Sequence, residues 1–139
     1  MNTSSTQTSG RLNPTLLMSS SAVFTGLLGV GASLFPQTLL SILGGAPESG
    51  SILFMNVAAP LYLGFAVLNW TARKKPIGGI YSRPVALGNF VHFFAVSISL
   101  VGSLGETANP GVLAVGTAAY ALFAGGFGSL LFAGGNQCG

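Results

Sequence analysis

The chain has 139 residues and very little charge. Charged residues make up 5% of it, and the only two acidic residues are Glu48 and Glu106, so aspartate is absent. A soluble domain carries about 25% charged residues, because water must solvate its surface. This composition excludes an ordinary soluble globular protein.

The residues that metal sites and catalytic centres require are equally scarce. The chain has one cysteine, Cys138, and one histidine, His92. A lone cysteine forms no internal disulfide, and with so few other ligands it builds no zinc site. The two glutamates fall in separate loops and form no carboxylate pair. We therefore predict no metal site and no catalytic residue, and we expect the protein not to be an enzyme.

The positive charges are few and scattered along the chain. The five cations are Arg11, Arg73, Lys74, Lys75 and Arg83. They form neither an array that follows a nucleic-acid groove nor an amphipathic helix, which argues against nucleic-acid binding. They do fit the bias of cytoplasmic loops beside transmembrane helices.

Long apolar runs are what the chain has in abundance. Four runs without any charged residue cover residues 15–35, 51–70, 85–104 and 111–133. About 20 helical residues cross a hydrocarbon core of about 30 Å. The connections are short, so successive crossings are antiparallel neighbours. We predict an all-α fold, a transmembrane up-down-up-down four-helix bundle that forms a single integral membrane domain over residues 1–139.

Residues 36–43 follow the first span and are too few to cross the membrane. Because they begin with Pro36, we expect either a short interfacial helix or a bent extension of the first span. Four crossings place both termini and the 71–84 loop on one side, together with all five cations. The positive-inside rule makes that side cytoplasmic.

Small residues are frequent, with 21 glycines in the chain. In lipid, small side chains let helix backbones approach one another. The last span carries two rows of them, namely Thr117, Ala121, Gly125, Ser129 and Ala133, and beside these Ala114, Ala118 and Gly126. Packing within the chain is the main interpretation. A contact surface for a homo-oligomer or for other membrane subunits is the alternative.

His92 lies inside the third span, about 10 Å beyond its first residue, Val85. Ionisable groups at such depth are costly and often functional. The main interpretation is a neutral histidine bonded to Asn69, Tyr62 or a backbone carbonyl. The alternatives are handling of a substrate or proton, and axial ligation of a pigment or haem, for which Gly88 would leave room. Asn89 and Ser99 are expected near the same helix face.

Polar and aromatic residues gather where the second and third spans meet the basic loop. The predicted residues for binding a ligand or an anionic lipid headgroup are Asn69, Arg73, Lys74, Lys75, Tyr81, Arg83 and Asn89. Each cation near a membrane surface contributes about 1 kcal/mol to its attraction for anionic headgroups. The predicted partners are thus the bilayer and its anionic headgroups.

Three segments of this region also carry a resemblance. They are GFAVLNW at 64–70, IGGIYSRP at 77–84 and GNFVHF at 88–93. In these segments the chain resembles an uncharacterised family of small bacterial four-helix integral membrane proteins. The resemblance implies residence in the bacterial inner membrane, and it implies no activity.

The expected function is that of a small non-enzymatic accessory or scaffold subunit in an oligomer or a larger membrane complex. One alternative is a transporter or channel protomer lined by the polar face of His92, with a kink at Pro60. The other is a membrane subunit that binds pigment or haem through His92.

Overall fold

The computed structural model describes residues 13–74 and 82–133. These residues form five helices and, within those two ranges, no strand. The helices are α1 (Pro14–Leu34), α2 (Pro36–Ile42), α3 (Ser49–Ala72), α4 (Ser82–Ser103) and α5 (Pro110–Ala133). All but α2 are long and apolar enough to cross a membrane. The predicted all-α fold with four spans is confirmed, and the protein is a multi-pass membrane protein.

The helices start where the sequence provides suitable residues. Asn13 has an extended backbone, and its Oδ1 accepts a hydrogen bond from the Thr15 amide at 3.0 Å, just ahead of Pro14 at the first helical position. An asparagine cap followed by proline satisfies the first free amides of a helix. Because α4 begins at Ser82 rather than Val85, His92 lies about 15 Å along it, near its middle.

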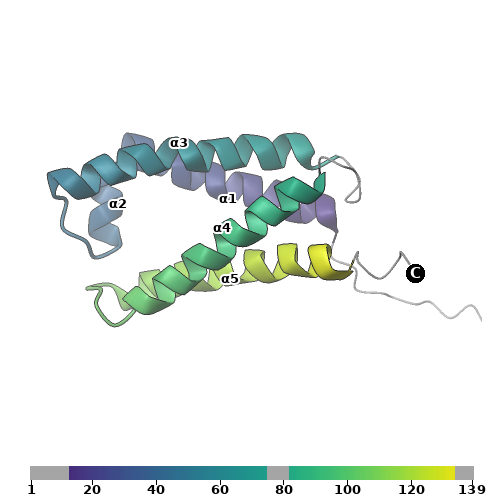
Figure 1. Cartoon of the computed structure of the whole chain (residues 1–139). Helices are drawn as coiled ribbons and strands as arrows, with labels where there is room; N and C mark the ends of the chain where they lie inside the picture. Colours follow the sequence, from purple (N-terminus) through teal and green to yellow (C-terminus); the bar gives the residue numbers. More distant parts are fainter. Residues whose placement is uncertain (1–12, 75–81, 134–139) are drawn as a thin grey trace, which may run out of the picture.

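The four long helices form two antiparallel hairpins (Figure 1). The first hairpin pairs α1 with α3, and the second pairs α4 with α5. Smaller contacts of α3 with α4 and of α1 with α5 complete the up-down-up-down arrangement. We call the end where α3 stops and α4 starts the cation end, because Arg73, Lys74 and Arg83 lie there. The opposite end, which carries Glu48 and Glu106, is the α2 end.

α2 is a separate helix and not a straight extension of α1. Phe35 adopts φ −133° and ψ 51°, which ends α1 immediately before Pro36. In Figure 1, α2 runs across the bundle from the end of α1 toward the α4–α5 loop. None of its residues is buried. Of the two expectations for residues 36–43, the separate short helix is the one observed.

Small residues bring helices close together at some of the predicted positions, including Gly126, whereas Ala114, Ala118, Ala121, Gly125 and Ser129 of the predicted rows are exposed. A Cβ added to Gly29 of α1 would lie 2.8 Å from Leu63 Cγ and 3.0 Å from the Leu63 backbone nitrogen of α3. Between the hairpins, a Cβ on Gly126 would lie 2.8 Å from Leu17 Cδ1. Such contacts let backbones approach in a setting where lipid is as apolar as leucine.

The core of the bundle is aromatic. Phe93 of α4 stacks on Phe123 and Phe127 of α5, with ring centroids 4.9 and 5.9 Å apart. Phe24 of α1 meets Tyr120 of α5 edge-on at 5.4 Å. Large apolar side chains also cover the outside of the bundle, which suits a surface in contact with lipid. Beside these rings lie buried polar side chains of the spans, among them Ser21, Asn69 and Asn89.

Candidate functional site

A buried polar cluster joins three helices near the cation end. Asn69 of α3 and Asn89 of α4 exchange two side-chain hydrogen bonds, with Nδ2–Oδ1 distances of 2.7 and 2.6 Å. Asn69 Nδ2 also donates to Ser21 Oγ of α1 at 3.1 Å. The three side chains are at most 1% exposed. We call Asn69, Asn89 and Ser21 the asparagine clamp.

Every N–H and O–H of the clamp side chains is used. The second N–H of Asn89 donates to the Val85 carbonyl at 2.8 Å, and Ser21 Oγ donates to the Met18 carbonyl at 3.0 Å. A fully satisfied polar network that excludes water fixes the register of the helices that supply it. The predicted neighbours Asn69 and Asn89 therefore meet, and they bond to each other. A ligand-binding role for them stays a prediction.

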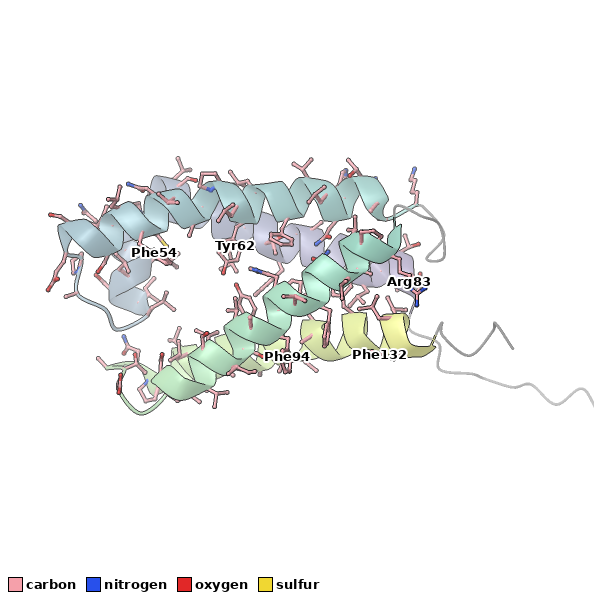
Figure 2. The ribbon with its side chains drawn as sticks, viewed as in Figure 1. Phe54, Tyr62, Arg83, Phe94 and Phe132 are labelled. Carbon is pink, nitrogen blue, oxygen red and sulfur yellow. The ribbon has the colours of Figure 1, made fainter. Side chains whose placement is uncertain are left out.

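His92 lies one helical turn beyond Asn89, among aromatic rings. Its imidazole stacks on Phe65 of α3, with centroids 4.6 Å apart and an interplanar angle of 25°. It meets Tyr62 of α3 edge-on at 5.3 Å. Its Nε2 is buried and has no hydrogen-bond partner in the described part of the chain. Figure 2 shows Tyr62 on the side of α3 that faces α4.

The hydrogen bond expected between His92 and Asn69 or Tyr62 does not form. Asn69 is fully engaged in the clamp, and the Tyr62 hydroxyl accepts a hydrogen bond from the Tyr120 hydroxyl at 2.8 Å. Ser99, expected on the same face, is exposed and donates to the Ala95 carbonyl instead. Asn69 is thus committed to other groups, and in the described residues His92 Nε2 bonds neither to Tyr62 nor to the backbone carbonyl that was the third expected partner.

The surroundings of His92 do not fit a pigment or haem bound through Nε2. An axial ligand needs open space for the metal and a flat macrocycle beside its nitrogen. The region next to Gly88 is open, since a Cβ there would meet nothing within 4 Å. However, Nε2 is enclosed, with Phe65 against the ring face and Tyr62 and Phe93 at its sides. In the described residues, no group of three or more His, Cys, Asp or Glu side chains could hold a metal ion.

The predicted basic residues that the structure describes lie at the cation end. The Arg73 guanidinium lies 3.4 Å from the centroid of the Trp70 ring, and Nη1 donates to the Trp70 carbonyl at 2.6 Å. Lys74 and Arg83 are exposed, and Figure 2 shows Arg83 where α4 begins. A half-exposed tryptophan covered by arginine suits the level of the lipid headgroups. Among the predicted site residues, Lys75 and Tyr81 lie outside the described residues, as do Arg11 and Cys138.

Sequence reasoning missed two polar residues of this region, Ser21 and Tyr120. Ser21 completes the clamp, and Tyr120 bonds Tyr62 across the two hairpins. Both are polar side chains inside apolar runs, and such residues usually face the interior of a bundle. The sequence pattern therefore predicts that both residues face the interior, but it does not predict which residues they bond to.

Neither the family models nor the curated proteins nor the solved structures include a match to this chain. The resemblance of residues 64–93 to small bacterial membrane proteins therefore stays a prediction, and so does residence in the bacterial inner membrane. The function has to be argued from the geometry of the helices.

Proposed function

We propose that the protein is a small non-enzymatic accessory or scaffold subunit that associates with other transmembrane helices, either in a homo-oligomer or in a larger membrane complex. The observation that supports this most directly is a row of small residues on the outer face of α5. We call these residues, Ala114, Ala118, Ala121, Gly125 and Ser129, the outer stripe.

α5 has small residues on two faces that serve different purposes. On the inner face, a Cβ on Gly128 would lie 3.1 Å from the ring of Phe90, so this glycine lets α4 approach. On the outer face, a Cβ on Gly125 would meet nothing within 4 Å. All members of the outer stripe are exposed. Their three- and four-residue spacing places them on one side of the helix.

Lipid tails gain little from meeting small side chains, whereas helix–helix contact in a membrane depends on them. Val115 and Leu122, which are 73% and 77% exposed, stand beside the outer stripe as larger ridges. Ridges beside a shallow row form the kind of surface into which a second helix packs. This arrangement favours a partner that is itself a membrane helix.

The internal polar groups also suit a structural role. The asparagine clamp and the Tyr62–Tyr120 pair bond helices to one another, so these side chains are used in assembling the bundle. At the cation end, Arg73, Lys74 and Arg83 favour a cytoplasmic orientation and contact with anionic headgroups. The proposal includes that orientation.

The experiment is native mass spectrometry on the full chain purified gently from its host membranes. An Ala118→Leu/Gly125→Leu double variant fills the outer stripe. Gly64→Leu is the matched control, because Gly64 of α3 is also exposed and a Cβ there meets nothing within 4 Å. The expected wild-type result is a multiple of the chain mass or a co-isolated subunit, lost in the double variant and kept in the control. A bare wild-type monomer, or an assembly that survives in the double variant, would contradict the proposal.

A transporter or channel protomer is the second candidate, and the unpartnered Nε2 of His92 favours it. Membrane-embedded ionisable groups commonly mark ion or substrate pathways. The test compares flux through proteoliposomes containing wild type, His92→Ala or Ser99→Ala, the last being an exposed polar control on the same helix. Flux lost only in His92→Ala supports this candidate, and flux unchanged in that variant removes it.

A further inference from the structure

We propose that the bundle opens at its α2 end, with α2 as a latch between the two hairpins and the asparagine clamp as the pivot. The proposal is independent of the accessory role. It depends on three features: the bonding of α2 to the second hairpin, the different exposure of the hydrogen bonds in the latch and in the clamp, and the missing hydrogen-bond partner of His92 Nε2.

At its C-terminus, α2 ends in a turn that leaves its last backbone carbonyls free to accept hydrogen bonds from other segments. Gly44 has φ +82°, its amide donates to the Ser41 carbonyl at 3.1 Å, and the Gly45 amide donates to the Leu40 carbonyl at 2.9 Å. This is the Schellman pattern, in which a left-handed glycine closes the last turn. The carbonyls of Ile42 and Leu43 remain for partners outside α2.

The α4–α5 loop of the second hairpin provides those partners. Thr107 Oγ1 donates to the Leu43 carbonyl at 2.8 Å, and Asn109 Nδ2 donates to the Ile42 carbonyl at 3.1 Å. The loops are so close that a Cβ on Gly44 would collide with Thr107 Oγ1. We call this contact between the end of α2 and residues 107–109 the α2 latch.

Of these two contacts between the hairpins, the latch is weaker than the clamp. The hydrogen bonds of Asn109 are exposed, so water can replace them when they break. The clamp is buried, so separating Asn69 from Asn89 there would leave amide groups without partners. Figure 1 shows α3 and α4 close together at the cation end and far apart toward α2. Opening is therefore expected at the α2 end.

His92 supplies a reason for the closed arrangement to open. It belongs to the second hairpin, and it packs against Phe65 and Tyr62 of the first, on the α2 side of the clamp. A buried polar atom without a partner destabilises the arrangement that buries it, and this opposes the contribution of the latch. Parting the hairpins at this level would open the space beside Nε2, and it would exchange the Tyr62–Tyr120 hydrogen bond for bonds to water. Two arrangements of similar free energy are both populated.

The test measures distances between spin labels on the full chain in lipid nanodiscs, in a Cys138→Ser background. One label pair replaces Glu48 and Glu106, exposed residues of opposite hairpins at the α2 end. A second pair replaces Lys74 and Arg83 at the cation end and reports on the pivot. Asn109→Asp is the main variant, because aspartate is also favoured immediately before a helix but opposes the Ile42 carbonyl with a second acceptor. We expect the 48–106 distances to shift to longer values while the 74–83 distances stay unchanged.

Gly44→Ala is a second, independent variant, and Gly45→Ala is its neighbouring control. The Gly44 Cβ would collide with Thr107 at a positive φ, whereas a Cβ on Gly45 comes no closer than 3.6 Å to the Leu40 carbonyl. We expect Gly44→Ala to lengthen the 48–106 distances and Gly45→Ala to leave them unchanged. Adding His92→Phe to Asn109→Asp should shift the distances back toward the closed value.

Two results would overturn the proposal. One is an unchanged 48–106 distribution in both Asn109→Asp and Gly44→Ala. The other is an equal lengthening of both label pairs, since that would mean general loosening rather than rotation about the clamp. If His92→Phe fails to restore the shorter distances, His92 does not drive the opening.

Discussion

The asparagine clamp and the α2 latch join the same two hairpins through the same chemical group, yet they should differ in strength. In the clamp, the Asn69 and Asn89 amides bond to each other, and both side chains are at most 1% exposed. In the latch, Asn109 bonds to backbone carbonyls in an exposed position. The contribution of an amide hydrogen bond depends on what replaces it when it breaks: water at the latch, and an unpaired buried group at the clamp.

His92 extends this comparison to a third case. Its Nε2 is as enclosed as the clamp amides, but it has no partner among the described residues. The three sites thus represent a buried group that is satisfied, an exposed group that is satisfied, and a buried group that is not. We expect substitutions at them to change the free energy of unfolding by different amounts and with different signs.

Breaking the clamp should have the largest effect. Asn69→Leu removes one partner of Asn89 and of Ser21, and we expect it to lower the free energy of unfolding by about 2–3 kcal/mol. Asn69→Leu/Asn89→Leu should cost less than the sum of the two single variants, since no unpaired amide remains. Reversible unfolding in mixed detergent–lipid micelles measures both. A double-mutant cycle with no coupling energy would show that the clamp is not a unit.

The second largest effect is expected from the packing of α1 against α3 in the first hairpin. This test measures the contribution of close helix contact without changing a side-chain hydrogen bond. Gly29→Ala places a Cβ 3.0 Å from the Leu63 backbone nitrogen, so α1 and α3 must move apart, at a cost of about 1–2 kcal/mol. Gly31→Ala on the same helix meets nothing within 4 Å and should not destabilise. The same unfolding assay compares the two variants, and equal effects would contradict the close approach of α1 and α3.

Replacing His92 should change stability in the opposite direction. His92→Phe keeps an aromatic ring against Phe65 and removes the unpartnered nitrogen, so we expect a gain of about 1 kcal/mol in the free energy of unfolding. Ser99→Ala on the same helix serves as the control, because Ser99 is exposed. If His92→Phe destabilises the protein, the imidazole has a bonding partner in the membrane and the comparison with the clamp fails at this site.

The smallest effect is expected at the latch. Asn109→Ala removes two exposed hydrogen bonds to the end of α2, which water can replace, and it should cost about 0.5–1 kcal/mol. The decisive measurement is its size relative to Asn69→Leu under identical conditions. Equal costs would mean that exposure does not distinguish the two joints, and the α2 end would then not be the end that opens.

The boundaries of the spans could be predicted closely because they depend only on consecutive residues of the chain. A charged residue is excluded from a lipid-spanning run, and the run must be about 20 residues long, so the boundaries can be read along the chain. The structure moves the start of the second long helix from residue 51 to Ser49, and that of the third from Val85 to Ser82. The second of these shifts places His92 three residues farther from the start of its helix than expected.

The site was only partly predictable. Asn69, Asn89 and His92 were expected to lie near one another, because the second and third spans are adjacent and antiparallel. The bonding was not predictable: Asn69 and Asn89 pair across 20 residues of sequence, and Tyr62 pairs with Tyr120 across 58. Those choices depend on helix rotation and on competition for partners, and neither can be read from a single helix.

The sequence by itself determined that this is a membrane protein with four helices, with the cations at one end and the glutamates at the other. Those features follow from the length, apolarity and charge of each segment, which are properties of consecutive residues. Only the tertiary structure decided that the asparagines bond to each other, that His92 Nε2 stays unpartnered, and that α2 is bonded to a loop more than 60 residues away. These outcomes depend on distances between helices, because a polar group buried in a membrane protein bonds to whatever partner packing brings within reach.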